Sequence, residues 1–433
     1  MIAETARHTL KNRVEDFRRK LYLSAKANPE RSYASLYDKV CRPDVLREAW
    51  RRVSSNDGAS GVDGVSIRRI REDGVEAYLE ELGTSLRERR YRPDRIKRVY
   101  IPKPDGRERP LGIPTVTDRV VQMAVKLVIE PLFEADFLDC SYGFRPGRSQ
   151  HQAMKAIDKY LYRGYRWVVD VDLKSYFDTI PHDRLMTLVE RRVYDRMILR
   201  LIRGWLKAGI VLEGKVTYAE TGSPQGSVIS PLLSNIYLHE VDRHWCRRGA
   251  NTQLVRYADD MVILCGTEAT ARREYDRLQG ILRELGLTLN AEKTRVVRAE
   301  DGFDFLGFSY RPGKCVLNGR KRTMMIKVPS RKSLAKIREG IKEAVKQLPL
   351  NESVARAVAV VNLRLRGWSN YFRIGHVWRS LKGLVWHAER QVRIFMRRKF
   401  QRKYSQGTRH SYPSNYLHET LGMYRVEVLY AGK

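Results

Sequence analysis

The chain has 433 residues, of which 42% are apolar and 30% are charged, so its composition excludes a disordered chain and leaves room for more than one globular domain. Its 82 Lys and Arg residues against 50 Asp and Glu residues give a net charge of +32, and an excess of this size favours a polyanionic partner. No apolar run is long enough to span a bilayer and no signal-peptide core follows the polar start, so we expect nucleic acid, and not a membrane, as that partner and a cytoplasmic location.

The first part of the chain is predicted to form basic helices up to about Trp50, because apolar residues recur there at helical spacing. A cluster of Gly, Asp and Ser at Ser54–Gly64 then predicts a loop. From Tyr91 the pattern changes to short strands and turns. Two apolar runs around the sequence PDG at residues 104–106 indicate a β-hairpin.

The central part of the chain alternates helical and strand patterns. We expect a helix at Asp118–Phe133, a strand at Trp167–Leu173, a long amphipathic helix at Arg184–Leu206, two strands within Val255–Leu264 and a helix at Ala271–Leu285. Such a mixture predicts an α+β body that extends to about residue 310.

Beyond Tyr310 the apolar spacing is that of helices only. Three helices are predicted, with apolar faces at residues 334–348, 354–368 and 377–396. Their opposite faces are rich in Arg, with Tyr and Trp between the charges, a combination that suits RNA backbone and unstacked bases. A solvated charged face is the alternative interpretation.

The carboxylates at Asp259 and Asp260 are the first chemical signal, because they lie at the tip of a predicted apolar hairpin. An ordinary solvated turn would explain them alone. A second acidic site, Asp170 and Asp172 in VVDVDLKSYFD, favours a metal-binding role for the carboxylates over an ordinary turn. Nucleotidyl transfer uses two divalent ions, and carboxylate oxygens suit Mg²⁺, with Mn²⁺ as an alternative. The five scattered cysteines form no CxxC pair, so neither a zinc knuckle nor a disulfide framework competes with this interpretation.

The sequence YADD, preceded by the pattern D-x-x-x-x-F, resembles motifs C and A of reverse transcriptases. The resemblance implies that Asp259 and Asp260 are the motif C metal ligands and that Asp172 is the motif A ligand, since Phe177 follows it by five positions. Asp170 would then be a structural neighbour. Phe177 resembles the family's steric gate against the 2′-hydroxyl of ribonucleotides, with ordinary core packing as its alternative.

Further motifs extend the resemblance across nearly the whole chain. GSPQGS followed by SPLLSN resembles motif B and implies that Gln225 contacts the incoming nucleotide. The segment IPKPDGRERPLGIP resembles the fingers and implies that Lys103 and Arg109 grip the triphosphate of a deoxynucleotide. LNAEKT resembles motif D, with Lys293 as a candidate proton donor to pyrophosphate. YGFRPGRS also matches a family segment, in which Arg145 could touch nucleotide or template.

The region beyond the polymerase motifs resembles the maturase, or X, domain of group II intron proteins, on the sequence LRGWSNYF at residues 365–372. Within its basic faces we expect Arg393, Arg397 and Arg398 to bind RNA. No CxxC or His-Asn-His nuclease pattern follows, which resembles the endonuclease-lacking intron proteins.

The sequence therefore predicts an α+β right-hand polymerase followed by an all-helical thumb/maturase module. The expected domains are residues 1–65 (N-terminal extension), 66–310 (fingers and palm) and 311–433 (thumb/maturase). The expected function is copying RNA into DNA, with binding of the parent group II intron RNA to assist splicing and retromobility. Template RNA, a DNA primer or target and dNTPs are the other expected partners, and the oligomeric state is left open. The alternatives are a domesticated reverse transcriptase in phage defence or DNA repair, and a splicing-only RNA-binding maturase.

Overall fold

The computed structural model describes residues 2–102, 108–218, 220–222, 226–246, 252–317, 320–400 and 412–425. The chain divides into two compact units, the first formed by residues 1–160 and 169–296 and the second by residues 161–168 and 297–433. No helix within the described ranges is both long and apolar enough to cross a membrane. The domain boundaries predicted at residues 65 and 310 stay predictions.

Helices dominate the start of the first unit, as the sequence predicts. They are α1 (Ile2–Ala27), α2 (Tyr37–Val40), α3 (Pro43–Ser54), α4 (Ile67–Asp73), α5 (Val75–Arg87) and α6 (Val116–Glu134). Helices α1, α3 and α6 pack against one another. Arg18 ties α1 to α6, because its buried guanidinium donates to a Glu130 carboxylate oxygen at 2.8 Å and to the carbonyl of Leu127 at 3.0 Å.

The first unit also contains a small sheet with the strand order β2-β1-β4-β5. Its strands are β1 (Ile96–Pro102), β2 (Glu108–Ile113), β4 (Ile210–Leu212) and β5 (Lys215–Thr217). Strands β1 and β2 are antiparallel, with Lys97 opposite Ile113 and Pro102 opposite Glu108. The predicted hairpin is therefore confirmed in its two strands, while residues 103–107 lie outside the described ranges.

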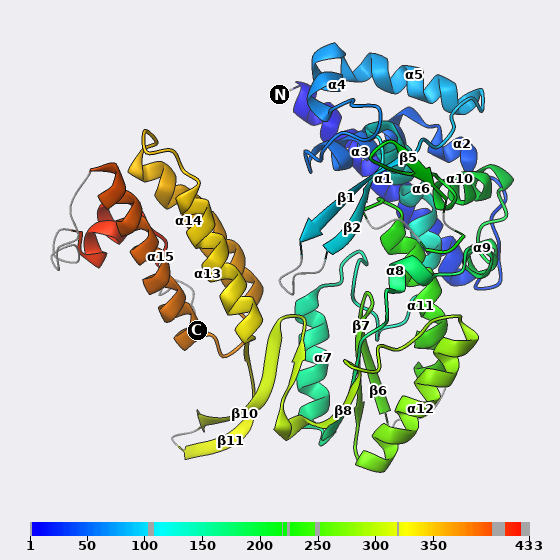
Figure 1. Ribbon diagram of the computed structural model, residues 1–433. Helices are drawn as coiled ribbons and strands as arrows, with labels where there is room; N and C mark the ends of the chain where they lie inside the picture. Colours follow the sequence, from blue (N-terminus) through cyan, green and yellow to red (C-terminus); the bar gives the residue numbers. More distant parts are fainter. Residues whose placement is uncertain are drawn as a thin grey trace. The chain divides into compact units, whose positions relative to one another are not determined.

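A second sheet, with the order β6-β7-β3-β8, carries the acidic motifs. Its strands are β3 (Trp167–Val171), β6 (Thr252–Tyr257), β7 (Asp260–Cys265) and β8 (Arg295–Arg298). The accompanying helices are α7 (Gln150–Tyr162), α8 (Tyr176–Thr179), α11 (Ser230–Cys246) and α12 (Glu268–Glu284). Helix α11 contacts β6 and α12 contacts β7, and Figure 1 shows both helices along the same side of the strands.

The long helix predicted at Arg184–Leu206 is wrong, because the segment forms two helices, α9 (His182–Glu190) and α10 (Arg196–Leu206). The break has two causes. Tyr33 pairs with the backbone on either side of Val193, which withdraws those groups from a helical ladder. Asp195 then caps α10 by accepting from the amides of Met197 and Ile198.

The second unit contains a three-stranded sheet and three long helices. Its strands are β9 (Phe303–Phe305), β10 (Phe308–Leu317) and β11 (Arg320–Pro329), preceded by the 3₁₀ turn η1 (Ala299–Asp301). Its helices are α13 (Arg331–Lys346), α14 (Val354–Phe372) and α15 (Trp378–Lys399), followed by the short π-helix η2 (Tyr416–Thr420). The three long helices contact one another around a common apolar core, and Figure 1 shows them side by side.

The all-helical module predicted for residues 311–433 is therefore wrong in its first part. Strands β10 and β11 form an antiparallel pair in which Phe308 faces Pro329 and Leu317 faces Arg320. The helical prediction overlooked an Asn-Gly pair at residues 318–319, the dipeptide most typical of tight hairpins, although the pair itself lies outside the described ranges. The three helices predicted after it are confirmed.

Candidate active site

The turn between β6 and β7 presents two carboxylates, as predicted. Tyr257 is paired with Asp260 across the antiparallel ladder, so Ala258 and Asp259 form the tip. Ala258 has φ = 58°, in the left-handed region that residues other than Gly seldom adopt. This tight tip leaves Asp259 half-buried and Asp260 exposed.

Asp172 comes directly after β3, the neighbour of β7 in the sheet, and it is close enough to the turn for its charge to act on both Asp259 and Asp260. Asp170 lies within β3, half-buried, and forms an ion pair with Arg295 on β8 at 3.5 Å. The ion pair fits the structural role expected of Asp170, while the metal-ligand role of Asp172 stays a prediction.

The segment LNAEKT holds Asp172 through side chain and backbone together. The Asn290 amide nitrogen donates to the Asp172 carboxylate at 2.9 Å, and its backbone N–H donates to the Asp172 carbonyl at 2.8 Å. Thr294 accepts from the Asp172 amide at 3.2 Å. Lys293 lies 3.4 Å from the same carboxylate oxygen that Asn290 contacts. Asn290 is thus a site residue to which the sequence assigned no function; its place in LNAEKT was the available signal.

The acidic cluster disfavours its own ionisation. Although Asp260 is exposed on its outer side, desolvation by the protein packed around it, followed by the charges of Asp259, Asp172 and Asp170, raises the pKa of Asp260 from its ordinary 3.8 to about 6. Burial also raises the pKa of Asp259, and the charge of Asp172 adds to the increase. A divalent cation would relieve this repulsion, and the donors are the hard oxygens that Mg²⁺ prefers.

The three carboxylates are not arranged as a ready-made metal centre. Among the described residues, no three His, Cys, Asp or Glu side chains are grouped closely enough to hold an ion. The Asp172 carboxylate is engaged by Lys293 and Asn290, so it must exchange these contacts to coordinate a cation. In donor type and in charge, the three carboxylates fit a divalent-cation site.

Two glycines of the motif-B-like segment allow close backbone approach on both sides. A Cβ on Gly222 would lie 2.9 Å from the Phe177 carbonyl oxygen, and one on Gly226 would lie 2.4 Å from the Gly112 carbonyl oxygen. Both glycines have positive φ angles, 93° and 107°. Gly222 therefore lies against α8 and Gly226 against β2, while residues 223–225, Gln225 among them, lie outside the described residues.

The predicted roles of Phe177 and Arg109 require accessible side chains, and neither side chain is buried. Phe177 is half-buried on α8, whereas its neighbour Tyr176 is buried and donates its hydroxyl to the Ser234 carbonyl at 2.9 Å. Tyr176, not Phe177, is thus the core aromatic of this segment. Arg109 is exposed on β2, and its charge lowers the pKa of Asp259, partly offsetting the effect of burial. Lys103 lies outside the described residues.

Two arginines with predicted ligand contacts are buried instead. Arg145 is 7% exposed and donates to both carboxylate oxygens of Glu134 and to the carbonyls of Phe137 and Ser141, so it is structural. Arg393 is also 7% exposed. It donates to the Tyr412 carbonyl at 2.8 Å and pairs with Glu389 at 3.0 Å, so its guanidinium is not available to RNA and that prediction is wrong. Arg397 is half-buried and Arg398 is exposed.

Comparison with known proteins finds two families along the chain. Residues 101–310 match the family model "Reverse transcriptase (RNA-dependent DNA polymerase)", and residues 334–412 match "Group II intron, maturase-specific domain".

Among the relatives of the chain, protein YkfC of Escherichia coli K12 is 38% identical over 68% of this chain and 87% of its own length. The group II intron-encoded protein LtrA of Lactococcus lactis is 38% identical over 51% of this chain but only 36% of its own length. A chain of the partial Cas6-RT-Cas1–Cas2 complex aligns with 57% of this chain and 42% of its own, at 23% identity and a TM-score of 0.36, which does not establish a common fold.

Proposed function

The chain belongs to the group II intron-encoded reverse transcriptases with a maturase domain, and from that premise we propose that it extends a DNA primer on an RNA template with Asp172, Asp259 and Asp260 as its metal ligands. Membership of this family gives the chain RNA-directed DNA polymerase activity and a role in intron splicing and retromobility. The site residues, the primer and the nucleotide substrates are the proposed part.

The observation that carries the proposal is the convergence of the acidic motifs on one sheet edge. Asp172 is 87 residues from Asp259 along the chain, yet it follows β3, the neighbour of β7 in the sheet, and its charge acts on both Asp259 and Asp260. Burial is the larger cause of the raised pKa values of Asp259 and Asp260, and the charge of Asp172 adds to both, which supports a shared acidic site. Two divalent ions held here would activate the primer 3′-hydroxyl and neutralise the triphosphate.

The residues around the carboxylates support the handling of a deoxynucleotide triphosphate. Arg109 is exposed and electrostatically coupled to Asp259, which suits a guanidinium that binds phosphate oxygens. Lys293, within 3.4 Å of Asp172, can donate a proton to the departing pyrophosphate once it releases that carboxylate. Phe177 would lie beneath the sugar, and Lys103 and Gln225 would complete the site.

The exposed side of α15 supports RNA binding by the second unit. Trp378, Lys382, Trp386 and Arg390 recur every four residues and are all exposed, so they form one stripe along the helix. Cations that alternate with aromatic rings suit phosphates and unstacked bases. We assign this stripe, with Arg398 and the half-buried Arg397, to intron RNA.

The test is extension of a DNA primer annealed to an RNA template by the purified chain with Mg²⁺. We expect Asp259→Asn to reduce the rate by about a thousandfold or more, since a metal ligand contributes several kcal/mol to transition-state stabilisation. Near-wild-type extension by the folded variant would overturn the assignment of the ligands.

A further inference from the structure

We propose that Arg256 is a positioning residue whose buried side chain, together with Asn235 and Asp242, holds the Tyr257–Asp260 turn in place. The inference rests on the proposed function, because it concerns how the Asp259 and Asp260 carboxylates are held ready for divalent ions. The Arg256 guanidinium contacts the SPLLSN and RYADD motifs directly, and Asn235 and the Arg256 backbone link it to the YGF motif.

The first contact is a bidentate ion pair in the interior of the first unit. Arg256 donates from Nε and Nη2 to the two carboxylate oxygens of Asp242 on α11, at 2.7 and 2.5 Å. Both side chains are 0% exposed. The pair fixes the plane of the guanidinium, because two parallel hydrogen bonds allow only one orientation.

The remaining nitrogen of that plane then reaches the catalytic turn. Arg256 Nη1 donates to the Ala258 carbonyl oxygen at 2.9 Å and to the Asn235 side-chain oxygen at 3.0 Å. Ala258 is the residue with φ = 58°, immediately before Asp259. A hydrogen bond to its carbonyl therefore holds an otherwise unfavourable backbone conformation directly beneath the two acids.

The loop before α7 closes the other side of the turn. The Asn235 amide nitrogen donates to the Gly143 carbonyl at 2.8 Å, and the backbone of Arg256 exchanges hydrogen bonds with Cys140 and Tyr142 at 2.8 and 2.9 Å. A Cβ on Gly143 would lie 2.3 Å from the Ala258 nitrogen, so only glycine fits against the turn. Asn235 thus links the guanidinium to the loop that borders the turn.

Stability alone is a poor explanation of a charge buried in this place. Burying an ion pair costs desolvation energy, and well-packed apolar residues of similar volume often stabilise a protein as well or better. Arg256 instead satisfies an acid, an amide and one strained backbone carbonyl at once, which an apolar side chain cannot do. The arrangement specifies one geometry of the turn.

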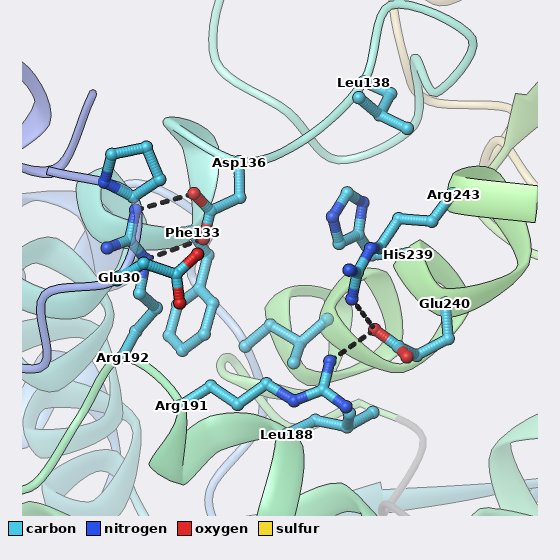
Figure 2. A pocket seen from close by; sticks show the side chains of 12 residues that line it. Glu30, Phe133, Asp136, Leu138, Leu188, Arg191, Arg192, His239, Glu240 and Arg243 are labelled. Atoms are coloured by element: carbon cyan, nitrogen blue, oxygen red, sulfur yellow. Dashed lines mark hydrogen bonds and ion pairs between the residues drawn. The ribbon is translucent and has the colours of Figure 1, made fainter. Parts of the chain in front are cut away.

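A second bidentate ion pair, in which the arginine is buried and the aspartate is half-buried, provides the control. Arg192 is 2% exposed and donates to both oxygens of Asp136 at 2.7 and 2.6 Å, and to the carbonyls of Ala25, Asn28 and Arg31. Figure 2 shows this pair at the side of a cavity of about 750 Å³ whose lining includes none of the catalytic carboxylates. Arg192 secures the chain after α1 and has no contact with the turn.

The experiment compares Asn235→Ala and Arg256→Lys with Arg192→Lys in the full chain. Three quantities are measured: the melting temperature, the affinity of the free protein for Mn²⁺ by electron paramagnetic resonance, and kcat and KM for single-nucleotide addition. We expect Asn235→Ala and Arg256→Lys to weaken Mn²⁺ binding and lower kcat by on the order of tenfold or more, as the loss of a supporting contact behind metal ligands does elsewhere. Arg192→Lys should lower the melting temperature comparably and leave Mn²⁺ affinity and kcat unchanged.

If Arg256→Lys does not fold, Asn235→Ala still tests the positioning role, because the Asn235 substitution removes no charge from the interior. Wild-type Mn²⁺ affinity and kcat in folded Asn235→Ala, or an equal loss in Arg192→Lys, would reduce the network to ordinary core packing. Asp259→Asn in the same assays separates this outcome from a failure of the proposed function. If Asp259→Asn binds Mn²⁺ and extends primers like the wild type, the metal assignment itself is wrong, whatever the network does.

Discussion

At the scale of single residues, Asp260 predicts how stability responds to pH. Its folded-state pKa is raised to about 6 from an ordinary 3.8, so between these values the folded protein holds a proton that the unfolded chain releases. Above the folded pKa the carboxylate is ionised in both states and its unfavourable surroundings reduce stability in full. As the pH falls below the folded pKa, this penalty is relieved.

Asp260→Asn should therefore stabilise the metal-free protein near neutral pH, and the gain should shrink as the pH falls through about 6 towards 4. The measurement is urea unfolding of both proteins in a chelator across this range. A gain that does not change with pH would contradict the raised pKa.

Phe177 gives a second prediction at this scale, on nucleotide selection. Phe177→Ala should admit ribonucleotides, because it removes a half-buried ring from the position assigned beneath the sugar. Loss of one such contact changes discrimination by about 1–3 kcal/mol, or roughly ten- to two-hundredfold. The measurement is the ratio of dNTP to rNTP incorporation efficiency. Tyr176→Phe is the control, since Tyr176 is buried and bonded to Ser234, and an unchanged ratio in active Phe177→Ala would make Phe177 a packing residue.

At the scale of elements, the sequence predicted the helices and strands that depend on residues close together in the chain. It missed the features that depend on contacts between residues far apart in the chain. Apolar periodicity gave the strands around Asp259 and the three long helices of the second unit, because each is set by residues close in sequence. It did not separate α9 from α10, since one cause of the break is the pairing with Tyr33, some 160 residues earlier, and the other, the Asp195 cap, was a local signal that the periodicity does not contain. For the same reason it gave Asn290 no role: its partner Asp172 is 118 residues away.

Helix α15 shows the same limit for charged residues and allows a direct test. The sequence predicted that Arg393 and Arg398 both bind RNA, but the Arg393 side chain is buried. Burial opposes ionisation of its partner Glu389, yet hydrogen bonds from Ser414 and His418 and the charge of Arg393 outweigh burial and lower the pKa of Glu389. Arg393→Ala should thus destabilise the protein by about 3–5 kcal/mol, because it leaves a buried carboxylate without its cation.

Arg398→Ala should instead keep stability and reduce RNA binding. Arg398 is exposed, so its loss should lower the slope of log affinity against log salt by about 1. The two measurements are chemical unfolding and binding of intron RNA over a salt series. Equal effects of the two variants on unfolding and on RNA affinity would show that exposure does not distinguish their roles.

At the scale of the whole molecule, one chain combines a reverse transcriptase domain and a group II intron maturase domain. The first unit contains the carboxylates, and most of the maturase match lies in the helices of the second unit. The net charge of +32 supplies the affinity for polyanions that both activities need, but it does not locate the site of synthesis. The proposed site lies in the sheet in which β3 is the neighbour of β7, where Asp172 and the Tyr257–Asp260 turn supply the carboxylates.

The most direct test of this account compares single-nucleotide addition by Asp172→Asn and Asp170→Asn, two acids two residues apart. Asp172 follows β3 at the acidic turn, whereas Asp170 is half-buried and paired with Arg295. We predict that Asp172→Asn reduces the rate of RNA-templated addition by about a thousandfold or more, and that Asp170→Asn reduces it by about tenfold at most. Equal losses in the two folded variants, or a wild-type rate in Asp172→Asn, would contradict the assignment of Asp172 to the catalytic metal site.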